Sequence, residues 1–139
     1  MIATNMLVPV DGSEISERAA AKAIELAQLT NSKLTFLYVA NLNPLAINVG
    51  LSDSIIQSIK HAGEEILQHA AGMVPNGIEV KCLQETGSPG VVILETAKIE
   101  GCDLIVMGSR GLGVVKGVFL GSVSQYVVEQ SVCPVMVVK

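Results

Sequence analysis

Signals for strands and helices alternate along the whole chain, and this alternation limits the fold more than any other feature. Short apolar stretches with strand character are separated by segments whose apolar residues recur at helical spacing. Strands are expected over residues 6–10, 33–39, 78–84, 104–107 and 134–138. Alternation of this kind predicts an α/β protein with a parallel sheet and right-handed crossover connections.

Helix signals fill the segments between the expected strands. Ser13 is the expected N-cap of the first helix, because its hydroxyl can accept a hydrogen bond from a free N–H group of the first turn. Ser88 and Pro89 open the third helix, with proline at the first helical position. The fourth helix is expected to begin at Ser122, since Ser122 and Gln125 have the spacing of a capping box.

Helices can cover both faces of a parallel sheet only if the strand order reverses once, and the order 3-2-1-4-5 meets this condition. We therefore expect a single domain over residues 1–139, a Rossmann-like open five-stranded parallel sheet with helices on both faces. Ligands of such sheets bind beyond the carboxyl ends of the strands, where the order reverses. Asp11, Val39 and Gly108 would meet at that point.

A glycine-rich loop follows the fourth expected strand and leads into the fourth expected helix. Its spacing is Gly108-x2-Gly111-x9-Gly121-Ser122. Glycines allow positive φ and close approach of the backbone to an anion. The free N–H groups of the loop and of the next helix attract negative charge. Arg110 and Lys116 add positive charge, so the loop predicts a phosphate-binding site for a nucleotide.

The spacing of this loop differs from that of two commoner glycine motifs. A Walker A loop ends in Gly-Lys followed by Ser or Thr, whereas here Lys116 precedes Gly117. A dinucleotide-binding fingerprint follows the first strand with the pattern Gly-x-Gly-x-x-Gly. Here Gly111-x-Gly113 follows the fourth expected strand and runs on to Lys116, so neither motif fits.

The glycine pattern resembles that of the ATP-binding branch of the universal stress protein family. The resemblance extends from about residue 6 to residue 139. It includes the opening motif over residues 7–13, the motif Thr86-Gly87-Ser88-Pro89 and the closing strand over residues 133–138. The match is weaker over residues 112–120, where the family itself varies.

The resemblance implies which residues bind the nucleotide. Residues that match Pro9, Asp11 and Val39 surround the adenine and ribose in family members that bind ATP, and the glycine loop holds the ribose and phosphates. The candidate residues at the glycine loop are Met107, Gly108, Ser109, Arg110, Gly111, Leu112, Gly113, Val114, Gly121, Ser122, Val123 and Ser124. The implied ligand is ATP with Mg²⁺, and we expect Gly111 and Gly121 to be needed for binding rather than for folding.

Two candidate residues keep a simpler interpretation beside the functional one. Asp11 could accept hydrogen bonds from ribose hydroxyls or from the adenine amino group, or it could cap the first helix as a strand-end carboxylate. Arg110 could pair with phosphate oxygens or stay solvated in an exposed loop. The sequence leaves both alternatives open.

The sequence gives little support for catalysis, because no residue set resembles the metal ligands or general base of phosphoryl transfer. We expect no catalytic residue and no protein metal site, and therefore a non-enzymatic ATP-binding protein with at most slow hydrolysis. Its ligand state would regulate an unidentified protein partner. The alternatives are a weak ATPase with a regulatory role, and a structural or chaperone-like dimer that binds no nucleotide.

Charge and composition exclude other classes of protein. The net charge of −4 argues against a nucleic-acid surface, and no apolar run approaches the length of a membrane span. No signal peptide is apparent, and Cys82, Cys102 and Cys133 form no Cys-x-x-Cys pair, so buried thiols in a reducing cytoplasm are expected. His61 and His69 are expected on a solvated helix face.

The fifth expected strand would lie at an edge of the sheet, where an uncovered row of apolar residues invites association. Val135, Met136, Val137 and Val138 form this row. Pairing with a second copy about a two-fold axis would satisfy the exposed backbone groups, and the family resemblance implies the same homodimer. The alternative is a monomer whose edge is covered by the N-terminal residues or by a loop.

Overall fold

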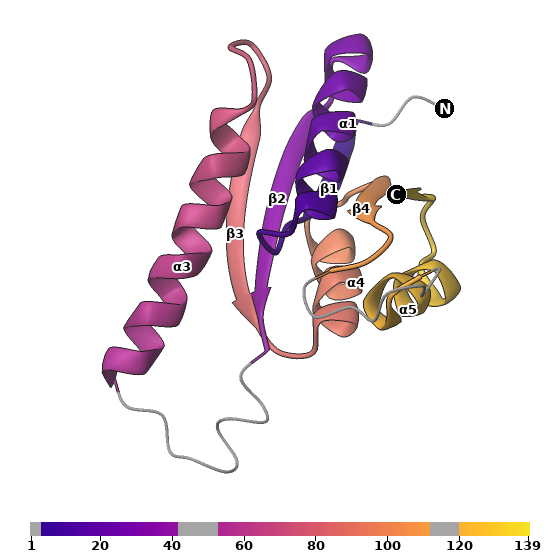
Figure 1. Ribbon diagram of the computed structural model, residues 1–139. Helices are drawn as coiled ribbons and strands as arrows, with labels where there is room; N and C mark the ends of the chain where they lie inside the picture. The colour runs from indigo at the N-terminus through magenta and orange to yellow at the C-terminus, as the bar shows by residue number, and fades with distance from the viewer. Residues whose placement is uncertain (1–3, 42–52, 112–119) are drawn as a thin grey trace.

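The computed structural model describes residues 4–41, 53–111 and 120–139 (Figure 1). Strands and helices alternate along these residues as the sequence predicts. The elements are β1 (Asn5–Pro9), α1 (Glu14–Thr30), β2 (Lys33–Ala40), α3 (Asp53–Gly72), β3 (Val80–Thr86), α4 (Pro89–Ile99), β4 (Leu104–Gly108), α5 (Ser122–Gln130) and β5 (Val135–Val138).

The five strands form one sheet in the order β3-β2-β1-β4-β5, and every neighbouring pair is parallel. This confirms the predicted fold class and strand order. The order reverses between β1 and β4, so their carboxyl ends border the predicted ligand site. β3 begins and ends two residues later than the sequence pattern suggested.

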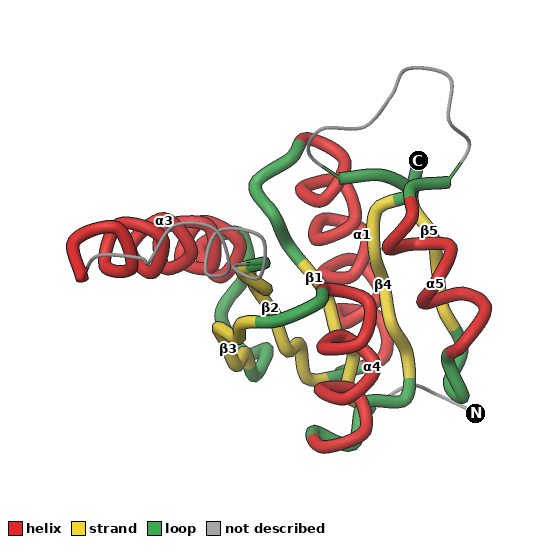
Figure 2. Tube along the Cα trace, turned by 90° about the horizontal axis from the view of Figure 1, so that it is seen from below, coloured by secondary structure: helices red, strands yellow, loops and turns green. Residues whose placement is uncertain are grey.

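Helices cover both faces of the sheet. α1 and α3 pack on one face and α4 and α5 on the other (Figure 2). β1 serves both cores, because Met6 and Val8 face α1 and α3 whereas Leu7 faces α4 and α5. α1 packs through a row of buried alanines, so its backbone lies close to the sheet.

The three predicted helix starts are confirmed, with α1 after Ser13, α4 at Pro89 and α5 at Ser122. The Ser13 hydroxyl accepts a hydrogen bond from the Ser16 N–H at 3.1 Å. Ser88 is the N-cap residue of α4, and Pro89 follows at the start of the helix, although the Ser88 side chain forms no capping hydrogen bond.

The predicted capping box of α5 is wrong, because Gly121 is the N-cap and Ser122 is already helical. The Gly121 N–H donates to the Ser109 carbonyl at 2.7 Å, and the Gly121 carbonyl accepts from the Gln125 N–H at 2.9 Å. This long-range contact to Ser109 fixes the chain at Gly121, so the N-cap lies one residue earlier than the capping-box pattern indicated, although the helix begins at Ser122 as predicted.

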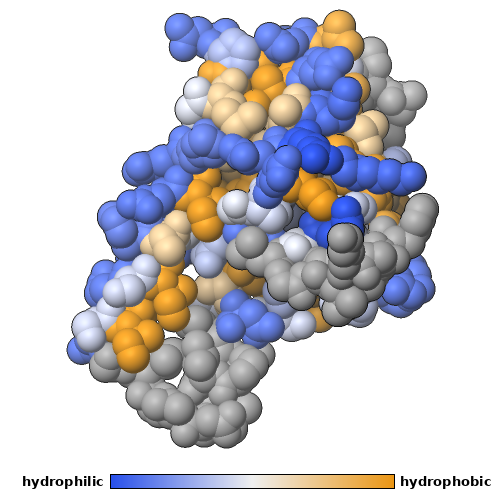
Figure 3. Space-filling model, in the orientation of Figure 1, coloured by the Kyte–Doolittle hydropathy of each residue, from blue (hydrophilic) through white to orange (hydrophobic). Residues whose placement is uncertain are grey.

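Hydrophilic side chains cover much of the surface in Figure 3, and hydrophobic surface is visible over the first turns of α3, where Ile55 and Ile56 are exposed. Within the described parts of the chain, no helix combines the length and apolar character needed to cross a membrane.

Candidate functional site

A cavity of about 390 Å³ lies at the carboxyl ends of β1, β2 and β4. Most of the predicted site residues that the structure describes border it, which brings together three separate parts of the sequence. The predicted residues at the cavity are Pro9, Asp11, Val39, Met107, Gly108, Arg110, Gly111, Gly121, Ser122, Val123 and Ser124. We call this space the switch-point cavity.

Ser109 is the one described candidate residue that does not border the switch-point cavity. Ser109 is buried, and its N–H donates to the Val138 carbonyl at 2.7 Å, so this residue joins β4 to β5 beside the cavity. Leu112, Gly113 and Val114 lie outside the described residues, as does Lys116.

Asp11 is held in place by the turn that leads into α1. Its Oδ1 accepts a hydrogen bond from the Ser13 N–H at 2.9 Å, and its own N–H donates to the Ser16 Oγ at 3.3 Å. Ser16 Oγ in turn donates to the Ser13 carbonyl at 3.1 Å. The carboxylate therefore organises the start of α1 and also borders the cavity, so both interpretations of Asp11 fit the geometry.

Ser16 is a cavity residue that the sequence reasoning missed. It is buried and borders the switch-point cavity, and its hydroxyl links Asp11 to Ser13. A signal was available, because a serine three residues after an N-cap can bond back to the turn that precedes the helix.

The glycines of the loop act through their small size, and the expectation of positive φ is wrong for those that the structure describes. Positive φ among the described glycines occurs at Gly12, Gly77, Gly87 and Gly101, outside this loop. An added Cβ at Gly111 would lie 2.5 Å from Oδ2 of Asp11. The loop backbone thus passes directly over the carboxylate.

Gly108 and Gly121 differ in the room around them. A Cβ at Gly108 would lie 2.6 Å from Cγ2 of Ile15, inside the packing of α1 against β4. A Cβ at Gly121 would meet its nearest atom, Cα of Arg110, at 3.4 Å, which is an ordinary contact. Gly108 is therefore required by the fold, whereas Gly121 has space on the cavity side.

The N-terminus of α5 is anchored to the end of β4. Ser124 is buried, and its hydroxyl donates to the Gly108 carbonyl at 2.7 Å. The first N–H groups of the helix have no carbonyl partner within the helix and carry the positive end of its dipole. Because Ser122 and Val123 border the switch-point cavity, this anchoring presents an anion-binding helix end to it.

The histidines and cysteines lie away from the switch-point cavity. His61 pairs with Glu65 at 3.0 Å, and His69 pairs with Glu17. The expectation of buried thiols is wrong, because Cys82 is exposed and Cys102 and Cys133 are only partly buried. Burial is the main cause that raises the pKa of Cys102 to about 11, and the carboxylate of Glu100 adds to this effect.

Comparison with known proteins gives one consistent result. The family model described as the universal stress protein family matches residues 3–139. The universal stress protein YxiE of Bacillus subtilis is 34% identical over 144 aligned positions, which cover 96% of this chain and 97% of that protein. A relative from Thermus aquaticus, also a universal stress protein, is 34% identical over 134 positions, which cover 96% and 97%.

Solved structures agree with the observed fold. The structure of the hypothetical protein MJ0577 superposes with a TM-score of 0.90 at 26% identity and covers 100% of this chain and 97% of that one. A universal stress protein family structure from Arabidopsis thaliana, described with AMP bound, has a TM-score of 0.71 at 25% identity and covers 98% and 91%.

Proposed function

Because the chain belongs to the universal stress protein family, we propose that it binds an adenine nucleotide in the switch-point cavity. The observation that carries this proposal is the convergence of Asp11, the glycine loop and the N-terminus of α5 on one cavity of about 390 Å³. Small-molecule sites in proteins typically measure roughly 300–1,000 Å³. The AMP-bound relative from Arabidopsis thaliana supports the choice of an adenine nucleotide.

The cavity offers a different chemical partner for each part of the ligand. Val39, Ile93 and Met107 belong to one apolar cluster and supply a surface for the base. The Asp11 carboxylate borders the same cavity and would accept hydrogen bonds from ribose hydroxyls. The backbone of the glycine loop, the first turn of α5 and the Arg110 guanidinium would receive the phosphates.

We propose ATP with Mg²⁺ as the full ligand. Among the described residues, no group of three or more carboxylate, imidazole or thiol side chains converges to hold a metal. The ion would therefore enter with the phosphate oxygens, and a serine hydroxyl such as that of Ser122 could complete its shell. When bound, Mg²⁺ would neutralise phosphate charge.

We propose that the protein is a regulator rather than an enzyme. Asp11 is the one carboxylate among the described residues of the switch-point cavity, and it already accepts a hydrogen bond from the turn before α1. Hydrolysis of ATP should then proceed far below the ~1–100 s⁻¹ of kinases. Phosphate release within that range, abolished by a loop substitution, would support an enzyme instead. The bound nucleotide would control an unidentified protein partner, and a cytoplasmic location stays a prediction.

Two measurements test the nucleotide proposal. Mass spectrometry of small molecules released from denatured protein should detect an adenine nucleotide, or calorimetry should detect binding of added ATP.

The Gly121→Val variant should lose ATP affinity at least tenfold, because its methyl groups enter the cavity. It should keep a cooperative melt, because the Cβ itself has room. An empty protein that ignores added ATP, or unchanged affinity in the variant, would contradict the proposed site.

We also propose a homodimer through β5, the edge strand that follows β4 in the sheet. The carbonyls of Pro134 and Val138 accept hydrogen bonds from the N–H groups of Ile105 in β4 and of Ser109, the residue after β4. Along a strand, the N–H and C=O groups of successive residues point alternately to one side and to the other. The backbone groups of Val135 and Val137 therefore point to the open edge. Antiparallel pairing with a second copy would use these groups and bury Val135, Met136, Val137 and Val138.

Light scattering tests the dimer. Wild-type protein should have twice the monomer mass of 14.5 kDa. The Val137→Pro variant should be monomeric, because proline removes an outward N–H donor and leaves the bonds to β4 intact. A wild-type mass near that of the monomer at micromolar concentration would overturn the dimer.

A further inference from the structure

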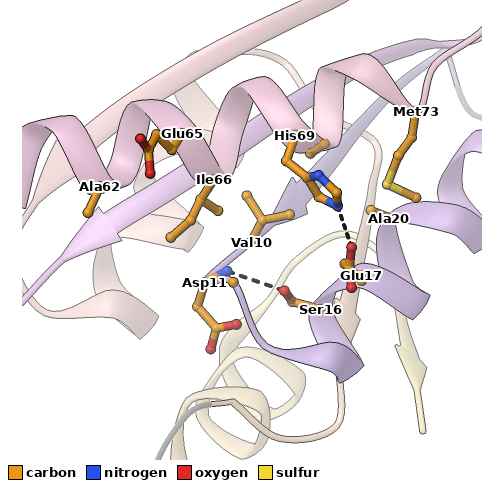
Figure 4. Close-up of a pocket in the computed structure, with 12 residues that line it drawn as sticks. Val10, Asp11, Ser16, Glu17, Ala20, Ala62, Glu65, Ile66, His69 and Met73 are labelled. Carbon is orange, nitrogen blue, oxygen red and sulfur yellow. Dashed lines mark hydrogen bonds and ion pairs between the residues drawn. The ribbon is translucent and has the colours of Figure 1, made fainter.

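A second cavity of about 540 Å³ lies between α1 and α3, on the face of the sheet opposite α4 and α5 (Figure 4). Its floor is Val10, the residue after β1, and the turn that follows. One wall is the first half of α1, and the other is α3 from Ala62 onward together with Met73, the residue after the helix. We call this space the interhelical cavity.

The interhelical cavity exists because small residues face it. Ala20 of α1 and Ala62 and Ala70 of α3 border it, so the two helices keep a gap between them above the sheet. Ile66 closes the floor, and its Cδ1 would lie only 3.2 Å from a Cβ added at Gly12. Gly12 has a φ of +86°, a backbone conformation that favours glycine, and its lack of a side chain leaves room for Ile66.

The interhelical cavity is lined by apolar residues and by acidic side chains. Val10, Ala20, Ile66 and Met73 supply hydrophobic surface. The lining includes the carboxylates Asp11, Glu17 and Glu65, and its described residues include no lysine or arginine. Figure 4 shows His69 of α3 reaching across to Glu17 of α1, and this pair joins the two helices beside the cavity.

We propose that the interhelical cavity is a second small-molecule site, which takes an organic cation with an apolar body, such as an arylalkylammonium ion. The volume falls within the range of ligand sites, roughly 300–1,000 Å³. The apolar body would lie against Ile66 and Met73. The ammonium group would lie at the Glu65 carboxylate in exchange for the ion pair of Glu65 with His61, while Glu17 keeps its pair with His69. An anion of the same shape would be repelled by the same groups.

The two cavities share one wall. Val10, Asp11 and Ser16 border both the interhelical cavity and the switch-point cavity. A cation bound between α1 and α3 therefore lies against the turn that positions Asp11. This step rests on the proposed nucleotide site, and it makes the second ligand an effector of nucleotide affinity, with reciprocal coupling.

Nuclear magnetic resonance of the full chain without nucleotide tests the second site directly. Three probes of similar shape are used: phenethylammonium, phenethyl alcohol and phenylacetate. Phenethylammonium should shift the amide signals of Ala20, Ile66 and Met73 saturably and bind several-fold more tightly than phenethyl alcohol, whereas phenylacetate should leave them unchanged. No saturable shift, or equal affinity for all three probes, would overturn the proposal.

Two variants locate the binding. Ala62→Trp should block the cavity and abolish the shifts at Ala20 and Met73, and Ala62 is exposed, so the larger side chain can be accommodated. Glu65→Gln should weaken phenethylammonium about threefold and leave phenethyl alcohol unaffected. Glu64→Gln is the matched control, because this neighbouring acid does not border the cavity. Equal effects of the two glutamine variants would mean that the probe is attracted by the negative surface charge in general, and this result would overturn the site.

Calorimetry with AMP tests the coupling. Saturating phenethylammonium should change the AMP dissociation constant at least twofold in the wild type and not in Ala62→Trp. An unchanged constant in the wild type would overturn the coupling. A protein that binds no AMP but still shows the cation-specific shifts would contradict the proposed nucleotide function and support the second site, so the two failures are distinguishable.

Discussion

The two ends of the sheet are built in opposite ways. At the amino ends, the Asp103 carboxylate accepts hydrogen bonds from the Thr4 and Asn5 N–H groups at 2.9–3.1 Å. Asn5 also donates through Nδ2 to the Glu100 carbonyl at 2.9 Å. At the carboxyl ends, glycines and the start of α5 surround a cavity of about 390 Å³. One end satisfies its polar groups internally, and the other surrounds a cavity, where we propose that a nucleotide binds.

This difference predicts that stability and binding can be separated by position. A substitution at the amino ends should change the free energy of unfolding and leave nucleotide affinity unchanged. A substitution at the carboxyl ends should do the reverse, unless it enters the packing beneath the site. Four substitutions test this separation, and they follow in order of expected effect.

Asp11→Ala should have the largest effect, a loss of roughly 10- to 100-fold in affinity for both adenosine and ATP. A hydrogen bond to a charged group contributes roughly 1.5–3 kcal/mol, and the nucleoside is common to both ligands. Calorimetry with the two ligands measures the effect. Arg110→Ala is the matched comparison, because it should weaken ATP more than adenosine. If Asp11→Ala left adenosine binding intact, the carboxylate would serve only the start of α1.

Gly108→Ala should break the simple separation of the two ends, because it lies at the carboxyl end and yet should destabilise the fold by about 1–3 kcal/mol. The added Cβ would meet Cγ2 of Ile15 at 2.6 Å in the packing of α1 against β4. Chemical denaturation measures the change. Gly72→Ala is the control, since a Cβ there meets no atom within 4 Å. Equal stability of the two variants would show that Ile15 moves aside without cost.

Gly111→Ala should weaken adenosine about three- to tenfold with little change in melting temperature. Its Cβ would lie 2.5 Å from Oδ2 of Asp11, so the flexible carboxylate must turn away. A double-mutant cycle by calorimetry tests this cause. In the Asp11→Ala background, Gly111→Ala should have no further effect on adenosine. Additive losses would mean that Gly111 acts on the ligand independently of Asp11.

The sequence predicted the framework of the molecule because the framework depends on local patterns. Periodicity gave the strands and helices, and the rule that helices cover both faces led to the observed strand order. The start of α1 at Ser13 follows from the chemistry of one side chain. The same rule of parallel sheets also predicted that Asp11, Val39 and Gly108 would border one cavity, as they do.

The details that escaped the sequence depend on contacts between distant residues. The N-cap of α5 is Gly121 rather than Ser122 because Gly121 bonds to Ser109, and the Ser124 hydroxyl is directed to Gly108. The reason for glycine at position 111 is its distance from Asp11, which lies 100 residues earlier. The interhelical cavity likewise depends on how far apart α1 and α3 lie, which no periodicity specifies.

Asp103→Asn should have the smallest effect, a loss of about 1 kcal/mol in unfolding free energy at neutral pH, because the site is partly solvated and its hydrogen bonds are screened. Partial burial tends to raise the pKa of Asp103, but hydrogen bonds from Thr4 and Asn5 outweigh this and lower the pKa overall. A carboxyl with a depressed pKa stabilises the fold above its unfolded pKa, about 4, and this contribution disappears as the pH falls through the folded value.

The difference in unfolding free energy between wild type and Asp103→Asn should thus be constant from pH 7 to about 5 and shrink below pH 4. Denaturation across this range measures it, with the equally charged change Glu64→Gln as control. Nucleotide affinity should be the same in both variants, and a loss of affinity in Asp103→Asn would show that the two ends of the sheet are coupled.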